Sequence, residues 1–196
     1  MRLFHGTSVK RLDGILKHGI KPRGRKKSCW KEHPSAPDRV YLTKSYAMFF
    51  GSVAAGIDEC EGAIVEVDSK LLPLVPDEDA LAQANFPDMP ELKEMDLKQR
   101  TKFWRMLAPM YKNLASESLR LLGNCAHIGR IKPVFIDRYV TFDPVEVIHV
   151  CDPTITIMNY RLVGHRHENV LTKYVDNKGA TVEEMVKWFN GEEGHG

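Results

Sequence analysis

The stretch Leu3-Phe4-His5-Gly6-Thr7-Ser8 and the later stretch Val40-Tyr41-Leu42-Thr43-Lys44-Ser45 decide how this sequence is interpreted. Each predicts a short strand that runs into a helix, because the apolar residues give way to a Ser or Thr able to cap a helix. A His and a Tyr therefore stand at the ends of two strands. Two such side chains can hold a flat ligand that carries a ribose between them.

The rest of the chain is read from hydrophobic periodicity and turn residues. The helix that Thr7 or Ser8 can cap is expected to end near Gly19. Asp77-Glu78-Asp79 is read as part of an irregular acidic loop, and a helical region from about Glu91 to Leu122 is divided by Pro109. Further strands are expected at 39–43, 62–68, 124–129, 138–142, 146–150 and 155–162, with helices at 45–55 and 182–189. Helices and strands followed by a strand-rich end indicate an α+β domain.

Length and composition limit the class of protein. The 196 residues, 43% of them hydrophobic, are enough for one buried core. We expect one domain over residues 1–190 and a frayed tail over 191–196. Without an apolar run of ~20 residues or a secretion signal, we expect a cytoplasmic protein that does not bind membranes. The four cysteines are scattered without a Cys-x-x-Cys pair, so we predict no metal site.

One segment concentrates positive charge, although the net charge of the chain is only +2. An aromatic ring within a basic loop can stack on a base while its neighbours contact phosphates. A solvated loop that binds nothing specific explains the same composition. The segment contains the basic residues Lys21, Arg23, Arg25, Lys26, Lys27 and Lys31, with Trp30 among them.

Two common nucleotide-binding motifs are excluded. Residues 19–26 approach a phosphate-binding P-loop, but Arg25 stands where that motif needs lysine, and the segment follows a helix instead of a strand. A Gly-x-Gly-x-x-Gly sequence is missing, which argues against a Rossmann site.

The ordered set of motifs resembles the His-Tyr branch of the ADP-ribosyltransferase superfamily. That branch includes poly(ADP-ribose) polymerases and diphtheria-toxin-like enzymes, and tRNA 2′-phosphotransferases are more distantly similar. The resemblance covers residues 3 to about 80, through His5-Gly6-Thr7, His18-Gly19-Ile20 and Val40-Tyr41-Leu42-Thr43. It implies a single compact α+β domain with split mixed or antiparallel sheets and flanking helices. It also implies NAD as co-substrate.

The resemblance assigns roles to individual residues. His5 would bond the ribose hydroxyl on the adenosine side, Gly6 would offer its backbone to the nicotinamide amide, and Tyr41 would stack on the nicotinamide ring. Thr7 would support the turn, and Phe50 would wall the pocket. A capping or core histidine and a core strand tyrosine are the alternative interpretations of His5 and Tyr41. The predicted cofactor-binding set is His5, Gly6, Thr7, Tyr41, Thr43, Ser45 and Phe50.

The chain departs from the family where a late strand usually carries a catalytic glutamate. Neither 124–130 nor 136–141 has Glu at an obvious equivalent place. His127 or Arg138 could occupy it, and these two are the predicted catalytic residues. Because elongation generally relies on that Glu, transfer of a single ADP-ribose is expected.

The acceptor is left open. Nucleic acid and protein are both considered, and the basic segment favours nucleic acid. An RNA 2′-phosphotransferase and a non-catalytic nucleotide- or RNA-binding module on the same fold are the alternatives. The sequence does not predict the oligomeric state.

Overall fold

The computed structural model describes residues 2–26, 35–44, 46–84, 90–149, 156–162 and 170–175. Within them, eight strands form one sheet in the order β4-β5-β2-β1-β3-β6-β7-β8, and every neighbouring pair is antiparallel. The strands are β1 (Arg2–Ser8), β2 (Arg39–Thr43), β3 (Gly62–Asp68), β4 (Leu74–Pro76), β5 (Asn124–Ile128), β6 (Ile136–His149), β7 (Thr156–Leu162) and β8 (Val170–Val175).

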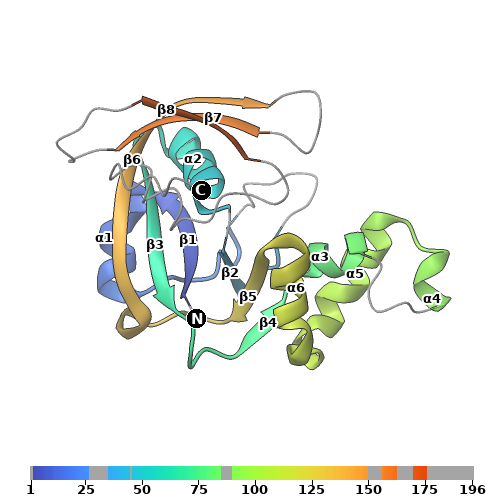
Figure 1. Ribbon diagram of the computed structural model, residues 1–196. Coiled ribbons are helices and arrows are strands. Elements are labelled where there is room, and N and C mark those ends of the chain that lie inside the picture. The colour runs from blue at the N-terminus through green and yellow to red at the C-terminus, as the bar shows by residue number, and fades with distance from the viewer. Residues whose placement is uncertain are drawn as a thin grey trace, which may run out of the picture.

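The helices fall into two groups. Figure 1 shows α1 and α2 beside the central strands, whereas α3 to α6 gather beyond β4 and β5 at the other side of the molecule. The α+β class predicted from the sequence is confirmed. The helices are α1 (Val9–His18), α2 (Ala47–Asp58), α3 (Glu78–Ala84), α4 (Pro90–Lys93), α5 (Leu97–Leu107) and α6 (Ala115–Leu122), with 3-10 turns η1 (Ala108–Met110), η2 (Lys112–Leu114) and η3 (Pro133–Phe135).

The junction between β1 and β2 is the weakest in the central part of the sheet. All seven residues of β1 pair with β3, and all five residues of β2 pair with β5. Within the described residues, β1 and β2 share only the pair Phe4↔Thr43. A strand edge that is not hydrogen-bonded to a neighbouring strand presents its backbone N–H and C=O groups to other partners. We call this junction, from Phe4 to Ser8 and from Arg39 to Thr43, the β1/β2 seam.

The sequence predicted two strands where the structure has one long strand, β6. It pairs with β3 as far as Phe142 and with β7 from Phe142 onward, and its register shifts between Pro144 and Glu146. Proline has no N–H to donate to the ladder, so it is found in sheets at such irregularities. β7 and β8 turn away from the central strands and lie at the top of Figure 1.

Strand alternation divides the side chains of β2 between two faces. Val40 and Leu42 pack into the main core with Leu3 of β1 and Leu12 of α1. Tyr41 therefore points to the opposite face, together with the residues two positions away, Arg39 and Thr43. This division decides which side chains can meet at the seam.

The other face of β1 is covered by α2, which crosses it at Gly6. A Cβ on Gly6 would lie 2.3 Å from the carbonyl oxygen of Ala47 and 2.4 Å from the nitrogen of Gly51. Helix α2 can therefore approach this closely only because residue 6 has no side chain.

Of the two predicted capping residues of α1, one behaves as expected and one does not. α1 ends as predicted at Gly19, whose φ is 80° and whose N–H donates to the Ile15 carbonyl oxygen at 2.7 Å. Ser8 stands at the N-cap of α1, but its hydroxyl donates to Asp58 of α2 and makes no cap bond. The predicted capping role of Ser8 is therefore wrong.

The helical region is divided as predicted, because Pro109 lies in η1 between α5 and α6. The expectation of an irregular loop over Asp77-Glu78-Asp79 is wrong, since α3 begins at Glu78. Asp77 starts this helix by accepting the N–H of Asp79 on its carboxylate at 2.9 Å. Of the expected elements, the helix at 182–189 lies outside the described residues. In the described part of the chain, no helix has the length and apolar character needed to cross a membrane.

Candidate functional site

The hydroxyl of Tyr41 is the centre of a hydrogen-bonded junction at the seam. It donates to Glu78 Oε1 at 2.5 Å and accepts the backbone N–H of Ala36 at 2.8 Å. Glu78, the first residue of α3, is 1% exposed. The phenol is thereby fixed from two sides, which also fixes the orientation of its ring.

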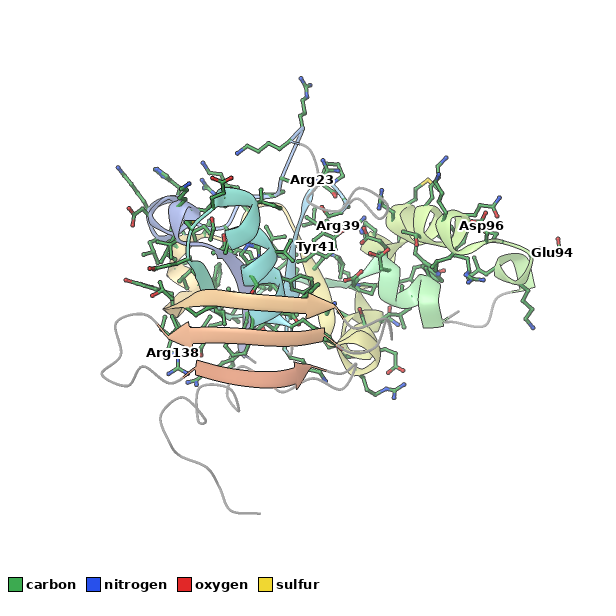
Figure 2. All side chains as sticks on the ribbon, turned by 90° about the horizontal axis from the view of Figure 1, so that it is seen from above. Arg23, Arg39, Tyr41, Glu94, Asp96 and Arg138 are labelled. Carbon is green, nitrogen blue, oxygen red and sulfur yellow. The ribbon has the colours of Figure 1, made fainter. Side chains whose placement is uncertain are left out.

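Two arginines share the carboxylate of Glu78. Arg39 Nη1 lies 3.0 Å from Oε2, and Arg105 Nε lies 3.4 Å from Oε1. Arg39 Nη2 also donates to the carbonyl oxygen of Arg105. We call Arg39, Tyr41, Glu78 and Arg105 the Glu78 cluster. It joins β2 to α3 and α5, and Figure 2 shows the Arg39 and Tyr41 side chains close together in the direction of those helices.

Burial sets the electrostatics of this cluster. Arg39 is 4% exposed and Glu78 is nearly inaccessible, and their ion pair avoids an unpaired charge in a place where such a charge costs several kcal/mol. Burial first, and the negative charge of Glu78 second, raise the pKa of the Tyr41 hydroxyl far above its ordinary value. The phenol therefore stays protonated and acts as a donor, not as an acid or a base.

His5 links β1 to β2 across the seam. Its Nδ1 lies 3.1 Å from the backbone carbonyl oxygen of Tyr41. A carbonyl only accepts, so Nδ1 carries the proton of this bond. Burial, with a smaller contribution from the charge of Arg11, lowers the pKa of His5. The ring is therefore neutral near pH 7, and its Nε2 holds a lone pair that can accept a hydroxyl proton.

Of the other predicted cofactor residues, Thr43 forms hydrogen bonds within the protein and Thr7 is buried. The hydroxyl of Thr43 donates to the Gly123 carbonyl oxygen at 3.0 Å and accepts the Tyr46 N–H at 3.0 Å. Thr7 is buried, whereas Phe50 is half-buried on α2 close to Gly6. Ser45 lies outside the described residues. Gly6 and Phe50 are thus brought together, on the face of β1 that α2 covers.

The two predicted catalytic residues lie away from Tyr41 and from each other. His127 pairs with Val40, which places it on the core face of β5, and its Nδ1 lies 3.1 Å from the Pro73 carbonyl oxygen. Arg138 lies on β6 and forms an ion pair with Glu66. Three strands separate β5 from β6, so the two residues are about 19 Å apart at a strand spacing of ~4.8 Å. They cannot both contact one reacting centre, and Figure 2 shows Arg138 apart from Arg39 and Tyr41.

Sequence reasoning missed Arg39, Glu78 and Arg105. Arg39 could have been found, because it lies two residues from Tyr41 and shares its face of the strand. Glu78 could not, since it is 37 residues from Tyr41 and only the packing of α3 against the sheet brings them together. The described residues contain no group of three His, Cys, Asp or Glu side chains that could hold a metal ion.

Comparisons with known proteins add little to this geometry. No family model and no curated protein matches the sequence. A solved structure named EcPltA is 8% identical, with a TM-score of 0.41, and the match covers 90% of this chain and 85% of that one. A similarity at this level carries no argument about fold or activity.

Proposed function

We propose that this chain is an NAD-dependent mono-ADP-ribosyltransferase that modifies a macromolecular acceptor, with nucleic acid favoured over protein. The main support is the contact of His5 with Tyr41 across the β1/β2 seam, where Nδ1 lies 3.1 Å from the Tyr41 carbonyl oxygen. The contact joins the imidazole to the backbone of Tyr41 and leaves Nε2 unprotonated on the core face, which His5 shares with Leu3. The Tyr41 ring lies on the opposite face, where its own hydroxyl fixes it. The imidazole has the chemistry to bind a ribose hydroxyl and the ring has the chemistry to stack on a flat base, one on each side of the seam.

Each part of the seam contacts a different part of NAD. Nε2 of His5 accepts a ribose hydroxyl proton, and the ring of Tyr41 stacks on nicotinamide. Beyond Phe4, the edge of β1 does not pair with β2 within the described residues. At Gly6 this edge offers its backbone groups to the nicotinamide amide. Because the Glu78 cluster holds the ring in place before the ligand arrives, less conformational entropy is lost on binding.

The reaction needs little from the protein beyond positioning and charge stabilisation. The bond from ribose C1 to the nicotinamide nitrogen breaks, nicotinamide leaves with that electron pair, and the acceptor atom forms the new bond to C1 and loses its proton. Holding the two reactants in line lowers the barrier by reducing the entropy lost in the transition state. Both oxygens of Glu78 are engaged by Tyr41 and the two arginines, so we assign Glu78 to positioning Tyr41.

Labelled NAD tests the proposal directly. The protein is incubated with NAD labelled in the adenylate part and with RNA, DNA and protein in separate reactions, and both nicotinamide release and label transfer are measured. Tyr41→Ala should abolish most of both signals. Tyr139→Ala, at a tyrosine that is 51% exposed on β6, is the matched control and should leave both unchanged. Wild type without nicotinamide release, or equal to Tyr41→Ala, would refute the proposal.

Two other functions each have one observation in their favour. An RNA 2′-phosphotransferase is favoured by the basic helix α5, whose Arg105 contacts the same Glu78 oxygen as the Tyr41 hydroxyl, and it predicts loss of an internal RNA 2′-phosphate only when NAD is present. A non-catalytic binding module is favoured by the full engagement of the Glu78 carboxylate. It predicts NAD binding without nicotinamide release.

A further inference from the structure

Helix α5 carries an unusual concentration of positive charge. Between Leu97 and Leu107 it has four basic residues and no acidic one. Lys98, Lys102 and Arg105 follow the spacing i, i+4, i+7, which places them in one row along the helix. Thr101 and Trp104 are buried on another face, so the row is not the packing face of α5.

The two lysines of this row differ from Arg105, which is paired with Glu78. Lys98 and Lys102 are exposed, and neither forms an ion pair within the described residues. The guanidinium of Arg100 donates to the carbonyl oxygens of Ala82 and Met95, which do not neutralise it. The nearest acidic residue before the helix, Asp96, is already engaged in capping the N–H of Gln99.

The row leads to the candidate site. Arg105 Nε lies 3.4 Å from Glu78 Oε1, the same oxygen that accepts the Tyr41 hydroxyl. From Lys98 to Arg105 the row is about 10 Å long, at a rise of ~1.5 Å per residue. One end therefore lies at the seam, and the other extends along α5 away from it.

A second basic element reaches the other side of the Tyr41 hydroxyl. Arg23 donates to the Ser35 carbonyl oxygen through Nε at 3.0 Å and Nη2 at 2.7 Å, and the next residue, Ala36, donates its N–H to Tyr41. Arg25 and Lys26 are exposed close to Arg23 in the sequence. Figure 2 shows Arg23, Arg39 and Tyr41 in the same part of the molecule. Tyr41 is thus connected to basic elements on two sides.

We propose that the exposed Lys98 and Lys102, in the row on α5 that ends at Arg105, form a track for the backbone of a single-stranded nucleic acid, which brings the acceptor nucleotide to Tyr41. Phosphates are the chemistry that matches two exposed lysine side chains that form no ion pair within the described residues. A single strand fits better than a duplex, because one row contacts one backbone and only an unpaired base can approach the seam. The delivery to Tyr41 rests on the proposed transferase function, but binding along α5 does not.

Fluorescence anisotropy without NAD tests the track separately from the chemistry. Labelled single-stranded RNA and DNA 12-mers are titrated with the protein at several salt concentrations between 50 and 200 mM. The double variant Lys98→Gln/Lys102→Gln should flatten the slope of log Kd against log salt by about 1.4, since each phosphate contact contributes ~0.7. If the variant and the wild type bind equally at 1 M salt, this difference in slope makes the variant bind about 25-fold more weakly at 0.1 M salt.

The matched control is Lys17→Gln/Lys70→Gln, which removes the same charge from exposed positions in α1 and after β3. It should retain the wild-type slope. The track is refuted if both double variants bind alike, if duplex of the same length binds more tightly than single strand, or if polyglutamate or anionic vesicles bind at Lys98 and Lys102 more tightly than the oligonucleotide. Normal oligonucleotide binding without nicotinamide release would contradict the transferase proposal only. Label transfer to nucleic acid that the α5 variant leaves unchanged would contradict the track only.

Discussion

The β1/β2 seam and the late strands β5 and β6 both carry residues that the sequence singles out, but the fold brings only the pair at the seam into contact. At the seam, His5 and Tyr41 come from segments 36 residues apart and meet through a hydrogen bond. On the late strands, His127 and Arg138 are only 11 positions apart in the chain, yet three strands lie between them in the sheet. Proximity in the chain is therefore a poor guide to proximity in a sheet whose strand order differs from the sequence order.

The same contrast appears within one strand pair. Tyr41 pairs with Ala126, a small residue on its own face, whereas Val40 pairs with His127 on the core face. A shift of one position in β5 would have placed His127 on the same face as Tyr41. The register of β5 therefore decides which of its side chains share a face with Tyr41, and substitutions at the seam and on the late strands should differ in their functional effects.

The largest effect is expected at Glu78. Glu78→Gln keeps an acceptor for Tyr41 but leaves the buried guanidinium of Arg39 without its main counter-charge. Removing one partner of a buried ion pair costs about 3–5 kcal/mol. Urea denaturation should show this loss in the free energy of unfolding. Glu117→Gln, which breaks the exposed pair with Arg120, is the control and should show no measurable change. Similar losses in both variants would contradict the buried cluster.

Next comes the ring of Tyr41. Stacking of an aromatic side chain on a base contributes about 1–3 kcal/mol, so Tyr41→Ala should raise the Kd for NAD about 5- to 150-fold. His127→Ala should change the Kd less than twofold, because His127 lies on β5, on the side of β2 away from the seam, with its imidazole at the Pro73 carbonyl oxygen. Isothermal titration at a temperature where both variants remain folded gives the comparison. If His127→Ala weakened binding as much as Tyr41→Ala, the separation of seam and late strands would be wrong.

A third prediction concerns the close approach of α2 to the seam. Gly6→Ala should lower the free energy of unfolding by about 1–3 kcal/mol, because the new methyl group would force Ala47 and Gly51 away. Gly14 is in α1 with no atom within 4 Å of its Cβ position. Gly14→Ala should therefore stabilise the protein by about 0.5–1 kcal/mol. Thermal unfolding of the two variants should move in opposite directions, and a Gly6→Ala protein as stable as wild type would contradict the packing.

The protonation of His5 gives a smaller effect. Its pKa is lowered in the folded state, so below about pH 6.5 the unfolded chain takes up a proton that folded His5 does not. This group therefore makes the protein less stable as the pH falls from 7 to 5. His5→Gln should show a shallower loss of unfolding free energy over that range, since the other histidines are common to both proteins. An unchanged or steeper slope would show that His5 is not held neutral.

The smallest effect is expected on β6. The side chain of Arg138 is 60% exposed, and ion pairs of this kind contribute about 0–1 kcal/mol. Arg138→Ala should leave nicotinamide release within twofold of wild type. A loss of release as large as that in Tyr41→Ala would return Arg138 to the catalytic role that the sequence suggested.

The sequence predicted the first part of the fold well because local signals determine it. β1, α1, β2, α2 and β3 lie where alternation, helical spacing and Gly19 place them. The sequence predicts two strands in place of β6 because Asp143-Pro144 is typical of a turn. In the structure, Pro144 lies beside a register shift, just after β6 changes its partner from β3 to β7. The acidic segment at Asp77 gave no sign that Glu78 would be buried, since its partners Arg39 and Arg105 are 39 and 27 residues away.

A crystal structure with NAD tests the central claim most directly. We predict that the nicotinamide half lies at the β1/β2 seam, with its ring against Tyr41, its amide on the backbone of Gly6 and a ribose hydroxyl on Nε2 of His5. The account would be contradicted if NAD bound elsewhere, such as beside Arg138 on β6. It would also be contradicted if crystals grown at saturating NAD showed the seam with the His5–Tyr41 bond intact and no ligand against either residue.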